Sequence, residues 1–573
     1  MMKRILGLTF TFILASISPV LSQDIAPEGA TGHTHKTSVS ADSYMISAAN
    51  PLAAQAGYDV LKEGGSAVDA MVATQMVLGL VEPQSSGLGG GAFLVYHDAK
   101  TGKPTTLDGR ETAPMAATPD LFLKPDGTPM KFFDAVVGGR SVGTPGTVKL
   151  MYEAHQRYGK LDWVRLLQPA IDLATDGFKV SPRLAKLIAK DQKRLSTSAT
   201  TRAYFFDQMG SPLPAGTVLK NPTYADTLRQ IAKYGADAFY QGPIAQDIVT
   251  AVRGASNPGL LNLDDLANYQ VIERSPTCMM YKDHRICGMG PPSSGGLTVG
   301  QILGMVQSFD LKKPTAQAFH IIAEASRLAF ADRGLYMADD DFVIMPEGLL
   351  NDNYLKHRAR LINPDKAATD AQPGIPPWSQ ATALSPDNSI ELPSTSHMSI
   401  IDADGNAVSL TTTIENGFGS RVMVRGFLLN NELTDFSFVP EKNGYLVANR
   451  LQPGKRPRSS MAPTIIYGPD DKLKMVVGSP GGSRIIGYVA QTIIGVLDWN
   501  MDVQDAISMP HVVKRFGTLD IETGADDLAS ELESFGHKVK VRDLNSGLHA
   551  IVRNDDAWVG GADPRREGIV MGK

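Results

Sequence analysis

A predicted β-hairpin begins with four residues whose side chains could take part in catalysis, Ser394, Thr395, Ser396 and His397. Its strands are expected over 396–402 and 407–414, because apolar and hydroxyl-bearing residues intermix on both sides of an Asp-Gly-Asn turn. A threonine hydroxyl is a weak nucleophile unless a base lies beside it, and a free α-amino group with a pKa of about 7.7–8.0 is such a base. Cleavage before Thr395 would therefore give this threonine its own base, whereas the uncleaved chain would be inactive.

The elements that must position this hairpin are intermixed helices and strands, and by themselves they indicate only a large α/β domain. The Pro-rich stretch 365–393 is expected to be an extended surface segment that can separate from Thr395 after cleavage. A strand is expected from Ala92 to Tyr96. Helices are expected from Asn50 to Gly64, Ala67 to Leu80, Thr147 to Tyr158, Trp163 to Ala174, Pro182 to Leu195, Tyr224 to Tyr234, Leu297 to Ser308, Thr315 to Tyr336 and Arg484 to Leu497.

Seven sequence blocks resemble the γ-glutamyltransferase (glutathione hydrolase) family. They follow the family order over most of the chain, which makes the resemblance specific. The blocks are S-S-G-L-G-G-G-A-F (85–93), L-D-G-R-E-T-A-P (107–114), P-P-S-S-G-G (291–296), S-T-S-H-M-S-I-I-D-A-D-G-N-A-V (394–408), L-L-N-N-E-L-T-D-F-S (428–437), K-R-P-R-S-S-M-A-P-T (455–464) and G-S-P-G-G-S-R-I-I (478–486).

The resemblance implies an N-terminal-nucleophile hydrolase that cuts its own chain between Ser394 and Thr395. The large subunit, 23–394, and the small subunit, 395–573, would remain together as a heterodimer that forms one catalytic domain. The implied fold is a four-layer α/β/β/α sandwich of two mainly antiparallel sheets between helical layers. The implied activity is cleavage of glutathione and other γ-glutamyl amides through a threonine acyl-enzyme, with transfer of the γ-glutamyl group to water, amino acids or peptides.

The resemblance also assigns catalytic roles to four residues. Thr395 is the nucleophile, and Thr413 hydrogen-bonds its hydroxyl. Gly481 and Gly482 supply the backbone N–H donors of an oxyanion hole, where glycine allows the main chain to approach the substrate closely. His397 is interpreted as structural, because the terminal amine already fills the role of general base.

Substrate-binding roles follow from the same alignment. Arg110, Ser459 and Ser460 would bind the α-carboxylate of the glutamyl group, a task that suits a bidentate guanidinium. Glu432 and Asp435 would hold the α-amino group, because an ammonium needs acceptors.

Glu415 departs from the family pattern, since members known for γ-glutamyl transfer usually carry Asn there. With Glu432 and Asp435 it would place three acids around one ammonium, which can raise the pKa of one of them. This departure leaves room for a glutaryl-type amidase of the same fold, similar to cephalosporin acylases. A processed but non-catalytic binding protein is the alternative from a different class.

The N-terminal segment 1–22 has the pattern of a secretory signal, with Lys3 and Arg4 before an apolar run and small residues near its end. It is short for a transmembrane span, although an uncleaved anchor is the alternative. A periplasmic or secreted protein, without membrane attachment after signal removal, is therefore predicted. The net charge of -5 argues against a nucleic-acid partner, and 43% hydrophobic residues can form a large core.

The two cysteines, Cys278 and Cys287, flank a predicted two-strand turn at Lys282 and Asp283. In an exported protein this spacing favours a hairpin disulfide, and two buried thiols are the alternative. The Gly-rich loop 85–91 lacks the Lys of a phosphate-binding P-loop and precedes a strand, so nucleotide binding is set aside. No metal-ligand spacing is found, and neither a metal nor a cofactor is expected.

Overall fold

The computed structural model describes residues 30, 32–387, 389, 391–392 and 394–573, so the predicted signal segment 1–22 lies outside the described residues. Two seven-stranded sheets lie face to face, and every described pairing within them is antiparallel. The first has the order β23-β2-β10-β11-β3-β4-β7 and the second β1-β22-β21-β17-β16-β9-β8.

The strands of the first sheet are β2 (Met45–Ala48), β3 (Gly91–Asp98), β4 (Lys103–Gly109), β7 (Ile272–Arg274), β10 (Thr395–Ile401), β11 (Ala407–Thr413) and β23 (Ile569–Gly572). Those of the second are β1 (Val39–Ala41), β8 (Thr277–Tyr281), β9 (His284–Gly288), β16 (Thr464–Tyr467), β17 (Leu473–Gly478), β21 (His549–Asn554) and β22 (Ala557–Ala562). Contacts of β10 with β17 and β21 and of β11 with β17 join the two sheets.

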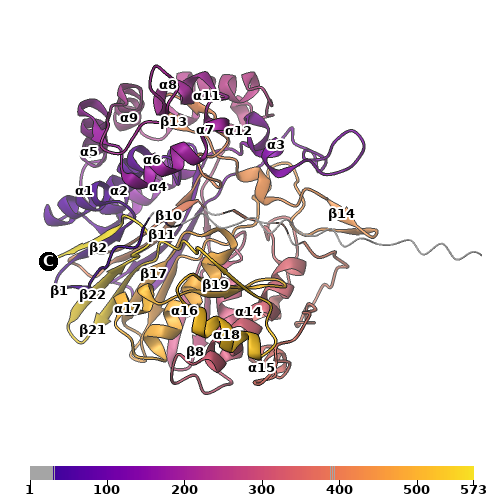
Figure 1. Ribbon diagram of the computed structural model, residues 1–573. Helices are drawn as coiled ribbons and strands as arrows, with labels where there is room; N and C mark the ends of the chain where they lie inside the picture. Colours follow the sequence, from indigo (N-terminus) through magenta and orange to yellow (C-terminus); the bar gives the residue numbers. More distant parts are fainter. Residues whose placement is uncertain (1–29, 31, 388, 390, 393) are drawn as a thin grey trace, which may run out of the picture.

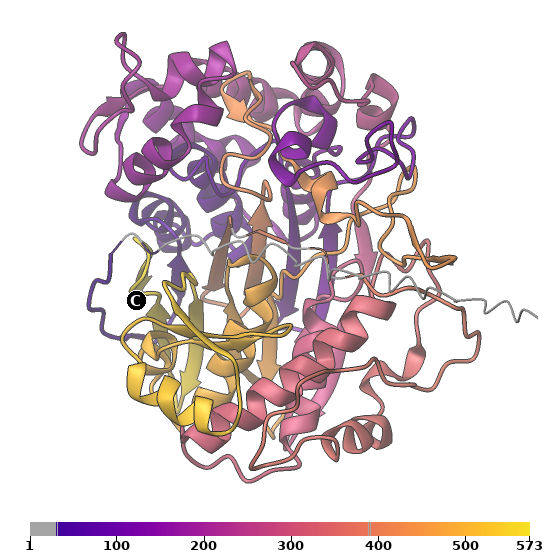
Figure 2. The same cartoon turned by 45° about the vertical axis from the view of Figure 1, so that its right-hand side comes forward.

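Helices cover the outer face of each sheet, which completes the predicted four-layer α/β/β/α sandwich (Figures 1 and 2). The first sheet lies under α1 (Pro51–Lys62), α2 (Ala67–Val81) and α4 (Thr147–Tyr158), and the same hydrophobic core continues outward to α5 (Trp163–Asp176), α9 (Pro222–Tyr234) and α11 (Gly242–Gly254). The second lies against α13 (Gly295–Val306), α14 (Ala316–Tyr336), α16 (Ile485–Leu497) and α17 (Val503–Ser508).

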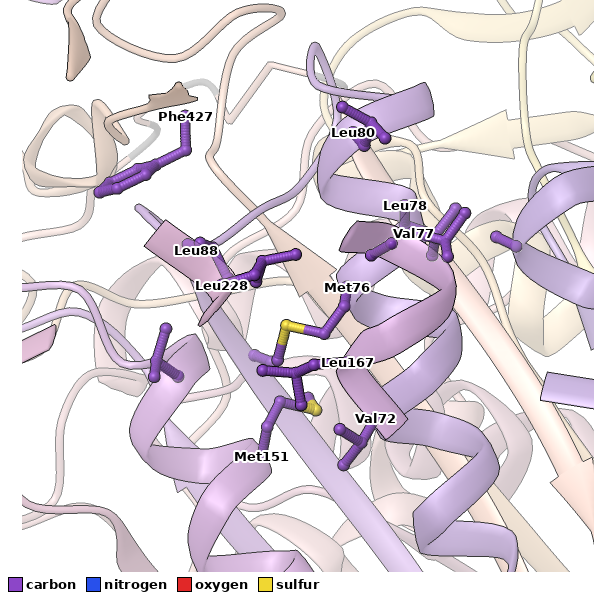
Figure 3. Packing of buried hydrophobic residues seen from close by; sticks show 14 of the residues in the cluster. Val72, Met76, Val77, Leu78, Leu80, Leu88, Met151, Leu167, Leu228 and Phe427 are labelled. Carbon is purple, nitrogen blue, oxygen red and sulfur yellow. The ribbon is translucent and has the colours of Figure 1, made fainter. Parts of the chain in front are cut away.

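Helix α2 is the centre of the first hydrophobic core, and every one of its residues is buried. Its sequence is apolar nearly all round, as expected for a helix with protein on every side. Ser66 and Asp69 form a capping box that fixes where it starts. Figure 3 shows Val72 and Met76 of this helix near Met151 of α4, Leu167 of α5 and Leu228 of α9.

The central hairpin β10–β11 is buried on both faces, because side chains alternate between the helices and the second sheet. Met398 and Ile400 pack with the helical core. The other face carries polar groups, and the hydroxyls of Ser399 and Ser409 donate to the carbonyls of His549 (3.0 Å) and Val477 (3.1 Å). Hydroxyl-rich strands can therefore be buried here, because the second sheet accepts their hydrogen bonds.

Most predicted helices and strands are present, with ends that shift by a few residues. One prediction was wrong: the stretch Pro182 to Leu195 forms two helices, α6 (Pro182–Lys190) and α7 (Gln192–Leu195). Asp191 interrupts it, with φ of -103° and ψ of 13°. Its carboxylate accepts hydrogen bonds from Arg421 (2.8 Å) and Arg194 (2.7 Å), which hold it at this break.

The segment 365–393, predicted to be an extended surface segment, lies at the surface only in part. Its first half is mostly exposed, but Asp387, Glu391 and Leu392 are buried. Two acids are buried near the cleavage site because buried arginines pair with them.

Cys278 and Cys287 form the disulfide. They are directly opposite each other in the β8–β9 pair, whose turn contains Lys282 with φ of 53°. Among the described helices, none is both long and apolar enough to cross a bilayer.

Candidate active site

The register of the first sheet brings the predicted catalytic residues to one end of the sandwich. Thr395 begins β10 and pairs with Thr413 at the end of β11, which in turn pairs with Gly91 at the start of β3. The next pairing places the end of β4, and hence Arg110, at the same edge. Residues that are hundreds of positions apart therefore meet, because antiparallel strands end and begin at one edge.

Thr413 lies between the predicted nucleophile and the bond that should break. Its Oγ1 is 3.3 Å from Thr395 Oγ1 and donates to the carbonyl oxygen of Ser394 at 3.0 Å. The backbone N–H of Glu415 donates to the same Oγ1 at 2.8 Å. Because Thr413 donates its own proton to the Ser394 carbonyl, its Oγ1 accepts the hydrogen bond from the Thr395 hydroxyl. Thr413 thereby polarises the same carbonyl that the Thr395 hydroxyl would attack.

A narrow pocket with a cavity volume of about 20 Å³ opens beside Thr395. Every residue predicted for catalysis or substrate binding lines it except Gly481. The lining is Arg110, Glu391, Leu392, Thr395, Thr413, Glu415, Glu432, Asp435, Ser459, Ser460, Met461, Gly482 and Ile485.

Gly481 and Gly482 form the turn between β17 and α16. Both have positive φ, at 140° and 58°, which favours glycine. A Cβ on Gly481 would meet the ring of Tyr488 at 2.7 Å. Gly482 begins a 3-10 turn that leads directly into α16, so its backbone N–H lies at the positive end of a helix, where developing negative charge is stabilised.

One wall of the pocket, here called the acid cluster, consists of Glu415, Glu432 and Asp435 around Arg110. The guanidinium of Arg110 pairs with Glu432 and, at 2.5 Å, with Asp435, and all four residues are buried. Both carboxylate oxygens of Glu415, one of Glu432 and one of Asp435 have no hydrogen-bond donor among the described residues. When they are ionised, these acids would offer four acceptor atoms to a cation in the pocket.

Burial sets the protonation of the acid cluster. It raises the pKa of Glu415 well above its usual range, helped by repulsion from Asp435. It also raises the pKa of Glu432 and brings that of Asp435 to about 6, although Arg110 opposes both shifts. A cation in the pocket would favour the ionised acids, so cation binding and proton release are coupled.

Next to the pocket lining lies the arginine pair, Arg333 and Arg458, which the sequence interpretation missed; its partner Glu391 lines the pocket. Arg333 on α14 pairs with Glu391, and Arg458 donates to Asp387 at 3.1 Å. Burial alone would raise the pKa of Glu391, but Arg333 and Arg458 outweigh it and lower that pKa. Arg458 lies inside the motif at 455–464, but no sequence signal connected it or Arg333 with the acidic residue four positions before Thr395.

Other predicted features have structural roles. Gly90 of the Gly-rich loop packs against the catalytic hairpin, since a Cβ there would lie 1.9 Å from the carbonyl oxygen of Thr413. His397 is buried against Gly478, and burial lowers its pKa well below the usual value, so its imidazole is neutral. Three clustered acids, 339–341, lie outside the pocket lining and are ion-paired with Arg274.

Residues 53–573 match the family described as Gamma-glutamyltranspeptidase. This range includes every residue that lines the pocket. The chain is 37% identical over 545 residues to the glutathione hydrolase proenzyme of Bacillus subtilis (strain 168), covering 92% of this chain and 91% of that protein. The corresponding protein of Escherichia coli (strain K12) is 38% identical over 539 residues, covering 91% and 90%.

Two solved structures are similar to this fold. Cephalosporin acylase from Bacillus halodurans has a TM-score of 0.83 and 29% identity, over 94% of this chain and 97% of that one. Helicobacter pylori gamma-glutamyltranspeptidase has a TM-score of 0.56 and 34% identity, over 62% of this chain and 99% of that one.

Proposed function

Because this chain belongs to the gamma-glutamyltranspeptidase family, we propose that it is an autoprocessing enzyme that cleaves glutathione and other γ-glutamyl amides. Thr395 would serve first in cutting the chain and then in catalysis. The observation that carries the proposal is the set of four unpartnered carboxylate oxygens in the same pocket as Thr395. An α-ammonium group is the substrate feature that such acceptors fit.

In the cleavage step, the Thr395 hydroxyl attacks the carbonyl carbon of Ser394. A C–O bond forms, the peptide C–N bond breaks, and the hydroxyl proton moves to the departing nitrogen. The hydrogen bond from Thr413 to the Ser394 carbonyl supports this step, because it stabilises the oxyanion as it develops. Water then hydrolyses the ester, which leaves a carboxylate on Ser394 and a free amine and hydroxyl on Thr395.

In catalysis, the freed amine of Thr395 takes the proton from its own hydroxyl, which attacks the γ-carbonyl of the donor. Gly481 and Gly482 supply the oxyanion hole, and the amine returns the proton to the leaving amine. The acyl-enzyme then passes its γ-glutamyl group to water or to an acceptor amine. Arg110, Ser459 and Ser460 would receive the α-carboxylate, while the acid cluster receives the α-ammonium.

The proposal includes the state and location of the enzyme. Large and small chains, 23–394 and 395–573, would stay together as a heterodimer, because β10 and β11 of the small chain lie between β2 and β3 of the large chain. The segment 1–22 would direct the protein to the periplasm or outside the cell, where the small-molecule donor is a substrate such as glutathione. Cell fractionation followed by N-terminal sequencing of the large chain tests the location.

The decisive experiment is intact mass of purified wild type beside Thr395→Ala, together with release of a chromogenic amine from a γ-glutamyl anilide. We expect wild type to give two chains split before Thr395 and to turn over the anilide. The Thr395→Ala protein should stay whole and inert. A wild-type chain that never splits would disprove the proposal, since the terminal amine would not exist.

The second candidate is a glutaryl-type amidase of the same fold. It is favoured by Glu415 in place of the Asn usual in the family and by the similarity to the Bacillus halodurans cephalosporin acylase. It is less supported, because a glutaryl group has no ammonium for the acid cluster. Glu415→Asn separates the two: a simple loss on γ-glutamyl substrates excludes the amidase, whereas improved γ-glutamyl turnover with loss of glutaryl turnover supports it.

A further inference from the structure

Arg333 is a buried guanidinium whose partners converge on one corner of the pocket. Its Nε donates to Ser294 Oγ and its Nη2 to Ser460 Oγ, both at 2.8 Å. The same Nη2 pairs with the carboxylate of Glu391. Arg333 does not line the pocket itself, but Glu391 and Ser460 do. Glu391 therefore covers the arginine on its pocket side.

Arg110, which lines the pocket, and Arg333, which lies behind Glu391, differ in what cleavage does to their partners. Arg110 pairs with Glu432 and Asp435, which stay in the small chain and cannot leave the site. Arg333 pairs with Glu391, which lies three residues before the new chain end at Ser394. Leu392 and Glu391 line the pocket beside Thr395, so withdrawal of this end would widen the space around the nucleophile for a donor.

Withdrawal of this end would leave a strongly charged corner. Asp387, the partner of Arg458, lies on the same segment, and Arg458 Nε is 3.8 Å from Glu391. Two buried arginines would then lose two carboxylates together. Buried charges need a partner of opposite sign, so this corner should take an anion in the processed enzyme.

We propose that Arg333, acting with Ser460, is a specificity-determining residue that binds the terminal carboxylate of the donor's acyl group, and that Glu391 occupies this place in the uncleaved chain. The inference rests on the proposed function for the identity of the donor. It adds a second guanidinium to Arg110, whose two amino groups are already engaged by the acid cluster. The recognised substrate class is an acyl group that ends in a carboxylate, which includes γ-glutamyl and glutaryl groups.

The first test uses the full-length Thr395→Ala precursor and needs no catalysis. Glu391→Ala removes the equivalent of one acetate from the corner, so we expect sodium acetate to raise the Tm of Thr395→Ala/Glu391→Ala relative to sodium chloride. Acetate should not raise the Tm of Thr395→Ala, where Glu391 fills the corner. Acetate should also not raise the Tm of the triple variant Thr395→Ala/Glu391→Ala/Arg333→Gln.

The second test compares two donors on processed enzyme. A γ-glutamyl anilide and a 4-aminobutyryl anilide differ only in the α-carboxylate. Arg333→Gln should reduce the wild-type preference for the γ-glutamyl donor, as a ratio of kcat/KM, at least tenfold, whereas Arg333→Lys should reduce it less. An unchanged ratio would overturn the proposal.

The outcomes of these tests separate this inference from the proposed function. If wild type turns over neither anilide, the proposed function fails, and the acetate experiment still decides whether the corner binds a carboxylate. If wild type is active but acetate has no effect on the Glu391→Ala precursor, the inference fails alone. If the Arg333→Gln precursor is not cleaved, the Arg333→Lys variant and the acetate measurement on the precursor still test the inference.

Discussion

The two charged clusters at the pocket, the acid cluster and the arginine pair, are built from the same groups, buried arginines and carboxylates, yet under the proposed function they would bind opposite ligands. In the acid cluster, three carboxylates surround Arg110, and four of their oxygens have no donor in the described part of the chain. In the arginine pair, each guanidinium has its own carboxylate, but both carboxylates belong to the segment that ends at the cleavage site.

This difference shows how one chain can be stable before processing and receptive afterwards. The acid cluster has an excess of negative charge, which burial partly neutralises by raising pKa values. The arginine pair is balanced until the chain is cut. A γ-glutamyl substrate carries both an ammonium and a carboxylate. Its ammonium would meet the carboxylates of the acid cluster, and its carboxylate would meet guanidinium groups that have lost their partners after cleavage.

The largest effect is expected from Arg110→Met, which would break the acid cluster. It would leave buried acids without their cation, so we expect turnover to fall at least about 10³-fold and stability at neutral pH to fall by about 3–5 kcal/mol. Because burial raises the pKa values of these acids, the stability loss should grow as pH rises above about 6 and shrink toward pH 5. Urea unfolding of wild type and Arg110→Met at neutral pH and at pH 5 measures this loss of stability.

The matched control adds Glu432→Gln and Asp435→Asn to Arg110→Met. This variant should regain stability at neutral pH without regaining turnover. If the single variant is as stable at pH 8 as wild type, the charge account of this wall is wrong.

The second largest effect concerns chain cleavage, which would remove the carboxylate partners of the arginine pair but leave the acid cluster unchanged. Thr413→Val removes the donor to the Ser394 carbonyl but nearly keeps the shape, so cleavage should slow by about 10²–10³-fold. The time course of chain splitting on a denaturing gel measures the rate. Thr413→Ser keeps the hydroxyl and should cleave far faster than the Val variant. Equal rates for the Val variant and wild type would exclude Thr413 from cleavage.

A smaller effect should appear in the pH dependence of inhibitor binding. Asp435 has a pKa of about 6, because burial outweighs Arg110, and it must be ionised to accept an ammonium. The affinity for L-glutamate as a competitive inhibitor should therefore fall up to about tenfold per pH unit below 6. Glutarate lacks the ammonium, and its affinity should not show this fall. The same pH profile for both inhibitors would contradict the assignment of the acid cluster.

The smallest effect on activity is expected from a site remote from both charged clusters. Replacing Cys278 and Cys287 with Ser removes a short cross-strand disulfide, which should cost about 2–3 kcal/mol of stability. Cleavage and turnover should be unchanged at temperatures where the protein is folded. Loss of turnover in the folded double variant would show that the second sheet edge controls the pocket.

The sequence predicted the position of a residue in the fold where that residue lies inside a contiguous motif. The turn Gly481-Gly482, the hairpin beginning at Thr395 and the stretch containing Glu432 and Asp435 each carry local signals that identify their place. Arg333 carries no such signal, because one arginine in a long helix does not reveal what it touches. Its partners Glu391 and Ser460 are 58 and 127 residues away in the sequence.

The sequence by itself determined the central hairpin, since short-range alternation and turn residues specify it. The resemblance of its motifs to the family indicated Thr395, Gly481, Gly482, Glu432 and Asp435 as candidates for nucleophile, oxyanion donors and ammonium acceptors. Only the tertiary structure decided that Asp387 and Glu391 are buried and that Arg333 and Arg458 face them. The reason is physical: burial and charge pairing depend on which distant segments pack together. That packing follows from the register of two sheets and is not written in any local pattern.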